Sequence, residues 1–447
     1  MKIIIVGCGK IGSTLAEQLS YEQHDLVVID IQQLSESIDV MGIAGNGSSV
    51  NVLSEAGVED AHILIAVTGS DELNLLCCVI AKKVSKCHTI ARVRNPIYNK
   101  ERNFIRKSLG ISMIINPEYS AAMEISRLLR FPSAIKLDTF AKGRVELMKF
   151  KILPEFRLDG LSVMEIVDNL KCNVLICGVE RDSEVFIPSG NFVLKDYDFI
   201  SIIASPANSA KFFKKIGVTT NQVKNAMIVG GGTLGYYLAA LLDELKIHVR
   251  MVESNVSRCE ELSELLPRIT VICGDGTDKK LLLEEGLTQT EAFVTLTNMD
   301  EENILLSLFA KKNSHAKLIT KVNRIAFDDI IDGLDLGSVI YPKYITADYI
   351  LRYVRAMENS LSSNVETLYH ILDGQAEALE FAVKESSSIT NTPLSDLNLK
   401  DNLLIACINR NGNIQIPRGQ DTIQVGDTVV VVTSIPGLRD LKDILKK

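Results

Sequence analysis

The sequence predicts an α/β protein with two tandem copies of one unit, each a doubly wound parallel sheet followed by a smaller α+β module. Two observations indicate this fold class. An internal repeat runs through the chain of 447 residues, and short apolar runs alternate with helical patterns in the first part of each copy. The length allows about two to four domains, each large enough to bury its own core.

Landmarks that recur at a constant spacing define the repeat. The glycine motif beginning at Gly7 recurs at Gly230, and Asp30 recurs as Glu253, both 223 residues later. From the next turn onward the offset is 229, so the second copy carries six extra residues after its acidic residue. The later pairs are 45–48 with 274–277, 71–74 with 300–303, 187–190 with 416–419, and Asp198 with Asp427. Each half is therefore one structural unit.

The first part of each half alternates strand-like and helix-like segments. In the first half we predict strands at 3–6, 26–29, 63–67 and 89–93, and a helix over 11–19. Short apolar runs of this kind are typical of strands buried on both faces of a parallel sheet. Their alternation with helices predicts a doubly wound sheet.

The pattern changes from about residue 144. Segments 144–152, 173–180 and 198–203 are predicted strands, separated by turns such as 188–190. The spacing of these strands and turns predicts a small α+β module.

A helix over 118–130, entered through Pro117, connects the two modules, and its counterpart runs from 344 to about 357 after Pro342. A surface helix normally has one apolar stripe, whereas these helices carry apolar residues on more than one side. The residues are Ala121, Ala122, Met123, Ile125, Leu128, Leu129, Ile350, Leu351 and Val354. We expect part of each helix to pack on another copy of the chain, which predicts a homo-oligomer, either a dimer or a tetramer. Burial within its own chain is the alternative.

Each glycine motif has the context that a dinucleotide-binding loop needs. It follows a strand-like run, precedes a helical pattern and lies 23 residues before an acidic residue. The first glycine makes a tight turn, the second lets the backbone approach a pyrophosphate, and the third lets helix and strand pack closely. We therefore predict a Rossmann-like site in each half, with phosphates at the helix N-terminus. The loops are Gly7, Cys8, Gly9, Lys10, Ile11, Gly12 and Gly230, Gly231, Gly232, Thr233, Leu234, Gly235.

The acidic residues Asp30 and Glu253 end the second strand of each half, where a carboxylate accepts hydrogen bonds from an adenosine ribose. A carboxylate there repels a 2′-phosphate, which favours NAD(H) over NADP(H). ATP and ADP carry the same ribose and remain alternatives.

Further ligand-facing positions follow from topology, because loops at the carboxyl ends of parallel strands form the crevice of this fold. The positions are Asn46, Thr68, Gly69 and Arg92 in the first half and Asp275, Thr297, Asn298 and Lys321 in the second. A cation at the fifth strand can neutralise phosphate, and Lys10 can add a second charge. A surface salt bridge is the alternative for Arg92, and a solvated side chain is the alternative for Lys10.

Composition argues against several other classes of protein. The net charge of -8 disfavours nucleic acid as a partner, because phosphate binding requires a basic surface. No run of about eighteen apolar residues occurs, so no transmembrane helix is expected. Nine irregularly spaced cysteines and six scattered histidines predict free buried thiols in a reducing cytosol and no metal site. No hydrolase, metalloprotease or P-loop motif occurs, so we predict no catalytic residues.

The whole chain resembles the RCK family, the regulators of potassium conductance that are also called KTN proteins. The stretches that carry the resemblance are 7–12 with Asp30, 56–61, 66–74, 91–93 and the turns 187–190 and 416–419. Departures also occur. Asn46 stands where the family usually has an acidic residue, and Glu253 and Lys321 replace the Asp and Arg of the first half.

The resemblance implies N-terminal RCK domains at 1–119 and 225–343 and C-terminal RCK domains at 136–222 and 363–447. It also implies a non-enzymatic, cytoplasmic regulatory subunit, peripheral on the inner face of the membrane. Its partner would be a membrane-embedded potassium transporter subunit, which a homo-oligomeric ring gates in response to NAD(H), ATP or ADP. An NAD-dependent oxidoreductase and a nucleotide sensor for a different membrane transporter are the alternatives.

Overall fold

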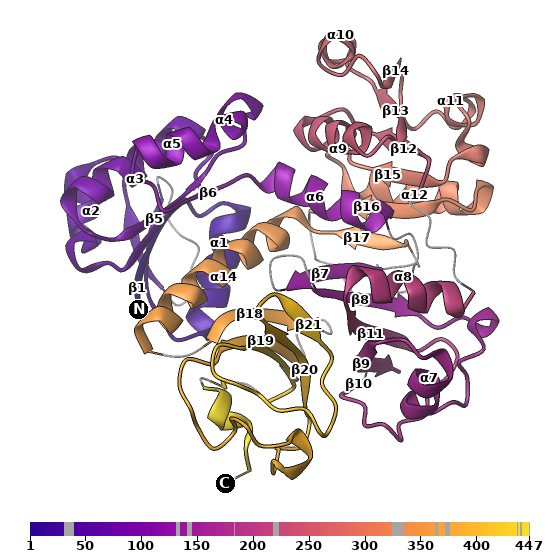
Figure 1. Ribbon diagram of the computed structural model, residues 1–447. Helices are drawn as coiled ribbons and strands as arrows, with labels where there is room; N and C mark the ends of the chain where they lie inside the picture. The colour runs from indigo at the N-terminus through magenta and orange to yellow at the C-terminus, as the bar shows by residue number, and fades with distance from the viewer. Residues whose placement is uncertain are drawn as a thin grey trace. The chain divides into compact units, whose positions relative to one another are not determined.

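The computed structural model of the protein describes residues 1–30, 40–130, 135–140, 145–182, 184–217, 223–323, 334, 336–362, 365–371, 376–435, 437–438 and 440–446. In these residues two parallel sheets of six strands and two antiparallel sheets of five strands confirm the predicted fold class (Figure 1). Contacts group the chain into two compact units. The first comprises residues 1–129 and 223–351, and the second comprises residues 130–222 and 352–447.

The first compact unit contains both parallel sheets. The strands of the first sheet, in the order β3-β2-β1-β4-β5-β6, are β1 (Lys2–Val6), β2 (Asp25–Asp30), β3 (Met41–Ala44), β4 (Ile63–Ala66), β5 (His88–Arg92) and β6 (Met113–Ile115). Its helices are α1 (Lys10–Tyr21), α2 (Val50–Glu55), η1 (Val58–Asp60), α3 (Asp71–Val84), α4 (Pro96–Lys100) and α5 (Arg102–Ser108). The central strand β1 is almost fully buried, as its apolar run predicts. The strand order reverses between β1 and β4, which places a crevice outside their carboxyl ends.

The second parallel sheet repeats the first strand for strand. In the order β14-β13-β12-β15-β16-β17, its strands are β12 (Asn225–Val229), β13 (His248–Glu253), β14 (Thr270–Cys273), β15 (Ala292–Thr295), β16 (Lys317–Lys321) and β17 (Ser338–Ile340). Its helices are α9 (Thr233–Glu244), α10 (Val256–Leu265), α11 (Lys279–Glu284), η4 (Leu287–Gln289) and α12 (Asp300–Asn313). The register is also repeated, since Lys2 pairs with Asp25 as Asn225 pairs with His248. The segment with six extra residues contains α10.

The connecting helices are α6 (Pro117–Arg130) and α14 (Pro342–Ser362), and each begins at its proline. Their apolar side chains are buried within this chain, except Met123, which is half-buried. The buried ones are Ala121, Ala122, Ile125, Leu128, Leu129, Ile350, Leu351 and Val354. The interpretation that these residues pack on another copy is therefore wrong. Periodicity shows that a helix is covered on several sides but not which residues cover it, so this pattern is no evidence for an oligomer.

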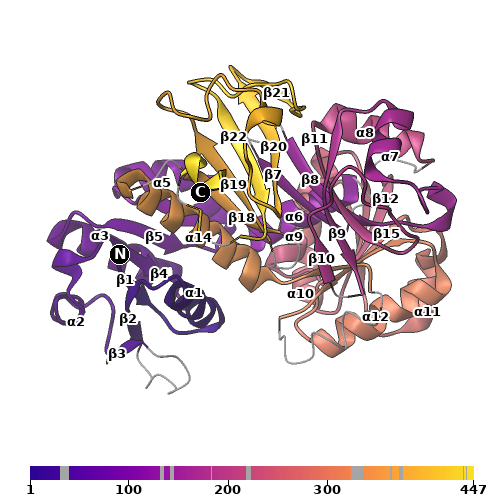
Figure 2. The same cartoon turned by 90° about the horizontal axis from the view of Figure 1, so that it is seen from below.

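The second compact unit contains both antiparallel sheets (Figure 2). The first, in the order β10-β9-β11-β8-β7, has strands β7 (Lys136–Phe140), β8 (Val145–Lys151), β9 (Val174–Arg181), β10 (Glu184–Phe186) and β11 (Phe199–Ala204), with η3 (Pro154–Phe156), α7 (Val163–Leu170) and α8 (Pro206–Lys215). The second, in the order β18-β19-β22-β20-β21, has strands β18 (Val365–Ile371), β19 (Ala376–Ala382), β20 (Leu403–Arg410), β21 (Asn413–Gln415) and β22 (Thr428–Thr433), with η6 (Leu394–Asp396) and η7 (Leu441–Ile444). Read from the opposite edge, the two orders correspond. Side chains such as Leu147 and Val432 from the two modules share one core.

Each small module contains an ion pair between a buried aspartate and a partly exposed arginine. The Arg181 guanidinium donates to both carboxylate oxygens of Asp198, at 2.8 and 2.6 Å, and Arg410 donates to Asp427 at 2.9 and 2.8 Å. Both aspartates are 2% exposed. Each also accepts a backbone N–H three residues upstream, at 2.8 Å. The aspartate that precedes the last strand in each module is therefore structural. Paired buried carboxylates of this kind are costly to disrupt.

A buried asparagine fixes the edge of each parallel sheet at which the crevice lies. The Asn74 amide oxygen accepts the Thr68 N–H and hydroxyl, both at 2.8 Å, and its amide nitrogen donates to the Arg92 carbonyl at 2.9 Å. In the second half Asn303 accepts the Thr297 N–H at 2.9 Å and donates to the Lys321 carbonyl at 3.0 Å. Both asparagines are fully buried. They tie the end of the fourth strand to the end of the fifth.

The replacement Asn74→Ala is expected to lower the free energy of unfolding by about 1–3 kcal/mol, because it leaves the Thr68 N–H and the Arg92 carbonyl without a partner. Chemical denaturation of wild type and variant measures this loss. The matched control is Asn51→Ala, an exposed asparagine on α2. Equal stabilities of the two variants would contradict the assigned role.

Candidate functional site

The first and third glycines of each motif are required by the fold itself. Gly7 has a φ of +102°, and a Cβ there would lie 2.9 Å from the Thr68 nitrogen. A Cβ on Gly12 would overlap the Gly7 carbonyl oxygen. In the second half Gly230 has a φ of +110°, and a Cβ on Gly235 would overlap its carbonyl oxygen in the same way. These glycines let the strand turn sharply and the helix pack against the turn.

The fold does not require a glycine at the second position of each motif. Gly9 and Gly232 are the N-cap residues of α1 and α9, with φ of -70° and -63° that any residue adopts. No atom lies within 4 Å of a Cβ built at either position. Neither backbone conformation nor packing requires glycine here, and the space before the helix N-terminus is open. The exposed N–H groups at this end of a helix favour an anion.

The acidic residues lie at the crevice and hold the glycine loops. The Asp30 carboxylate accepts the backbone N–H of Cys8, and the Glu253 carboxylate accepts that of Gly231 at 2.7 Å. The second Glu253 oxygen accepts the Asn255 N–H at 2.8 Å. Each carboxylate is thus fixed at the end of its strand, beside the loop that follows the neighbouring strand.

The residues after the third strands close their own turns. Asn46 accepts the N–H and hydroxyl of Ser48 at 3.0 and 2.9 Å, and Asp275 accepts those of Thr277, both at 2.8 Å. The Thr277 backbone N–H and then its hydroxyl lower the pKa of Asp275. Asparagine and aspartate therefore close the same turn, because each supplies a side-chain acceptor oxygen.

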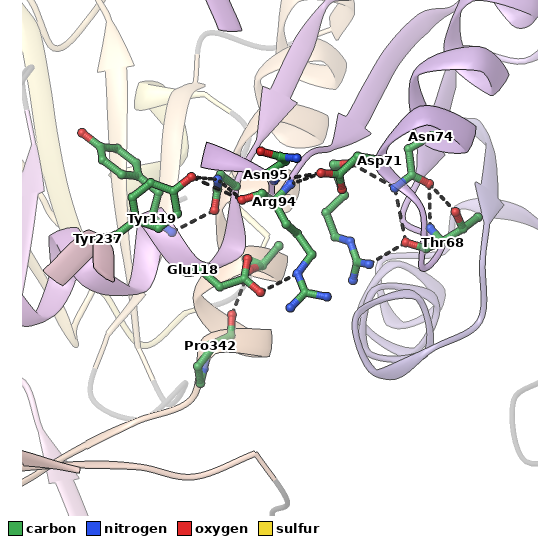
Figure 3. A network of polar contacts seen from close by, with 12 residues as sticks. Thr68, Asp71, Asn74, Arg94, Asn95, Glu118, Tyr119, Tyr237 and Pro342 are labelled. Atoms are coloured by element: carbon green, nitrogen blue, oxygen red, sulfur yellow. Dashed lines mark hydrogen bonds and ion pairs between the residues drawn. The ribbon is translucent and has the colours of Figure 1, made fainter. Parts of the chain in front are cut away.

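The cations of the fifth strands point toward the end of the fourth. Arg92 Nη2 donates to the Thr68 carbonyl at 2.5 Å, and Lys321 Nζ donates to the Leu296 carbonyl at 3.2 Å. Burial lowers the pKa of both side chains. Within the described ranges Arg92 forms no salt bridge, so the surface ion pair considered for it is absent there. The neighbouring Arg94 forms one instead, with Glu118 at 2.6 Å (Figure 3).

The remaining predicted residues fall into three groups by exposure. Lys10, Gly69 and Asn298 are exposed, and Thr68, Thr297, Thr233 and Cys8 are half-buried beside the crevice. Ile11 and Leu234 are buried on the inner side of their helices, so only their backbone can face a ligand. The exposure of Lys10 leaves its side chain free to reach a ligand or to remain in solvent.

Sequence reasoning missed a contact that joins the two halves within the first unit. The Asn116 amide donates to the Tyr237 hydroxyl at 3.0 Å, and this hydroxyl donates to the Arg94 carbonyl at 3.2 Å (Figure 3). The Tyr119 and Tyr237 rings meet edge to face, with centroids 5.4 Å apart. Tyr237 lies on α9, directly behind the second glycine loop. The sequence carried no signal for this contact, because Asn116 and Tyr237 are 121 residues apart.

The repeated segments 71–74 and 300–303 also hold the loops that follow the fifth strands. Asp71 accepts the N–H groups of Arg94 and Asn95, at 2.9 and 2.8 Å, and Asp300 accepts that of Asn323 at 2.9 Å. Together with the buried asparagines, these carboxylates order the loops after the fifth strands. A polar residue that recurs at the start of a helix beside an apolar strand is the signal that could have identified them.

Metal and membrane features can be judged for the described part of the chain. It holds no group of three or more side chains arranged to bind a metal ion. None of its helices has both the length and the hydropathy needed to span a bilayer. All nine cysteines are free. Seven are buried as predicted, but Cys8 is half-buried and Cys273 is exposed, so burial of every thiol is wrong.

Comparison with known protein families supports the internal repeat. The TrkA-N domain family matches residues 3–117 and again 226–342, and the TrkA-C domain family matches residues 378–446. The two TrkA-N matches therefore coincide with the two parallel-sheet regions.

Solved structures share the fold at low sequence identity. A structure described as the GsuK channel has a TM-score of 0.65 at 18% identity and covers 97% of this chain and 76% of its own. The GsuK RCK domain has a TM-score of 0.64 at 18% identity and covers 96% and 92%.

Curated relatives extend over the whole length. The Trk system potassium uptake protein TrkA homolog of Archaeoglobus fulgidus is 32% identical over 451 residues and covers 100% of both chains. TrkA homolog 1 of Methanosarcina mazei is 31% identical over 458 residues, again covering 100% of both chains. TrkA of Haemophilus influenzae is 31% identical over 448 residues, covering 97% of this chain and 96% of its own. The chain therefore belongs to the TrkA family of Trk system potassium uptake proteins.

Proposed function

We propose that this protein is a non-catalytic regulatory subunit of a potassium uptake system and that it senses an adenine nucleotide at two sites. Membership of the TrkA family supports the link to potassium uptake, since the full-length relatives carry that name. A membrane-embedded potassium transporter subunit is then the partner, and the present chain works peripherally on its cytoplasmic side.

One observation supports the proposal that the chain binds nucleotides. Gly9 and Gly232 are glycines in ordinary extended conformation with open space around them, yet both halves keep them at a helix N-terminus. A glycine that the protein itself does not need is explained by a ligand whose pyrophosphate approaches the backbone there. Because the two halves differ at many other positions, a glycine at this position in both halves indicates a common requirement.

The contacts around each loop assign roles to the other residues. The pyrophosphate lies against loops 7–12 and 230–235, at the N-termini of α1 and α9. Asp30 and Glu253 accept hydrogen bonds from the adenosine ribose. Arg92 and Lys321 supply positive charge at the phosphate side of the crevice. NAD(H) fits both carboxylates, and ATP and ADP, which carry the same ribose, are the alternative ligands.

Regulation follows from differential affinity. A ligand shifts a conformational equilibrium only as far as it prefers one state, so a preference of about 1–3 kcal/mol per site accumulates over several sites. The Tyr237 hydroxyl joins helix α9, which follows the second loop, to Asn116 and the Arg94 carbonyl of the first half. We further propose a homo-oligomer, a dimer or a tetrameric ring, which multiplies the number of sites.

The ribose role predicts how charge at position 30 affects binding. In a Gly232→Asp background that leaves only the first site, Asp30→Ala should weaken NADH binding by about 1–3 kcal/mol. Asp30→Asn keeps an acceptor for the Cys8 N–H but loses the charge, so it should narrow the preference for NADH over NADPH. Calorimetric titration measures both effects. Asp25→Ala, an exposed residue on the same strand, is the control. Unchanged NADH affinity in both Asp30 variants would refute the assignment.

The regulatory role predicts a nucleotide-dependent potassium flux. Reconstituted with its transporter in proteoliposomes, wild type should change the potassium flux over a titration with NADH, ATP or ADP. Gly9→Asp together with Gly232→Asp should abolish this dependence, because the new carboxylates occupy the space that the pyrophosphate needs. Gly190→Asp, at a turn of the first small module where a Cβ meets only Met164 at 3.7 Å, is the control. A nucleotide response that survives the double replacement would exclude these sites as the sensors.

A further inference from the structure

The two halves differ most in the segment that follows their acidic residues. In the second half this segment contains helix α10 (Val256–Leu265), which carries Arg258 five residues after Glu253. In the first half no lysine or arginine occurs between Asp30 and Lys82. The second crevice therefore has a cation near its acidic residue that the corresponding segment of the first half cannot supply.

Helix α10 packs closely on the second glycine loop because Gly231 has no side chain. A Cβ on Gly231 would lie 2.6 Å from Leu262 Cδ1 and 3.1 Å from the Glu253 side chain. Leu262, on α10, is fully buried. The first half has Cys8 at the position of Gly231, so its loop carries a side chain there.

This packing holds the Arg258 guanidinium in a defined place. Its Nε donates to the Gly231 carbonyl at 2.8 Å, and its Nη1 donates to Glu261 at 2.6 Å. The N–H of the same Gly231 is bound by Glu253 at 2.7 Å. One loop residue is thus held from both sides, by the acid and by the guanidinium. The Arg258 side chain remains 25% exposed.

In the proposed binding mode, the base of the nucleotide lies on the side of the crevice where Arg258 is held. With the pyrophosphate at Gly232 and the ribose at Glu253, the base extends away from the phosphates, toward the segment just after Glu253. Asn255 caps α10 there by accepting the Arg258 N–H at 3.0 Å, which places the start of α10 at this end of the crevice. A guanidinium is planar, delocalised and weakly hydrated, so it stacks well on an aromatic base.

We propose that Arg258 recognises the adenine base of the nucleotide at the second site by stacking. This inference rests on the proposed function, because it requires an adenine nucleotide in that crevice. It makes the two sites unequal: the second has a preformed platform for the base, and the first has no cation from the same segment. The second site then selects for the base as well as for the phosphates and the ribose.

The test uses the full chain with Gly9→Asp, which leaves only the second site, and compares ADP with inorganic pyrophosphate. Arg258→Ala should weaken ADP binding about tenfold and change pyrophosphate binding less than twofold, since only ADP has a base to stack. Arg258→Lys should not restore ADP affinity, because it keeps the charge without the plane. Arg268→Ala is the matched control, since its side chain is 73% exposed and pairs with Asp243.

The outcomes separate this inference from the proposed function. ADP binding to the Gly9→Asp protein that is unaffected by Arg258→Ala overturns the stacking role and leaves the second site in place. Recovery of ADP affinity in Arg258→Lys, or equal losses for ADP and pyrophosphate, shows that charge alone acts and also overturns it. If the Gly9→Asp protein binds no ADP while the Gly232→Asp protein does, the second site itself is rejected and the inference with it. A circular dichroism spectrum and melting temperature equal to those of Arg268→Ala exclude misfolding as the cause of any loss.

Discussion

The contact between the third glycine of each motif and the carbonyl of the first is the constraint on which the crevices depend. Because Gly12 and Gly235 have no side chain, their helices pack directly on the turns at Gly7 and Gly230. This approach aims the helix N-termini at the carboxyl ends of β1 and β12 and brings the loop N–H groups within reach of the acids that end β2 and β13. The position of this turn therefore determines where the helix N-terminus and the acidic residue lie in each crevice.

Buried polar groups then hold the opposite wall of each crevice. Asn74 and Asn303 connect the ends of neighbouring strands. Each pairs with backbone N–H and carbonyl groups that would otherwise be buried without a partner. The two halves keep the same parallel sheet although their sequences differ around the crevice. Cys8 in the first loop corresponds to Gly231 in the second, and the segment after Glu253 contains helix α10, which carries Arg258.

The sequence predicted the parallel sheets, the glycine loops and the acids because these depend on local patterns: apolar runs, glycine spacing and an acid at a strand end. It did not predict the contact between Asn116 and Tyr237, since nothing local marks a partner in the other half. It also predicted that part of α6 and of α14 packs on another copy, whereas the apolar residues of these helices other than Met123 are buried within the chain. The apolar pattern of a helix shows that its surface is buried. Only the three-dimensional structure shows which residues bury it. The short strands β6 and β17, with three residues each, are too brief for any periodicity to identify.

The stoichiometry of nucleotide binding tests the central claim most directly. Equilibrium dialysis of the purified protein against labelled NADH, and in parallel against labelled ATP and ADP, counts the ligands bound per chain. The account predicts two per chain for wild type with at least one of these nucleotides, one for Gly9→Asp, one for Gly232→Asp and none for the double variant. Undiminished binding by the double variant, or no binding of any of the three by wild type, would contradict it.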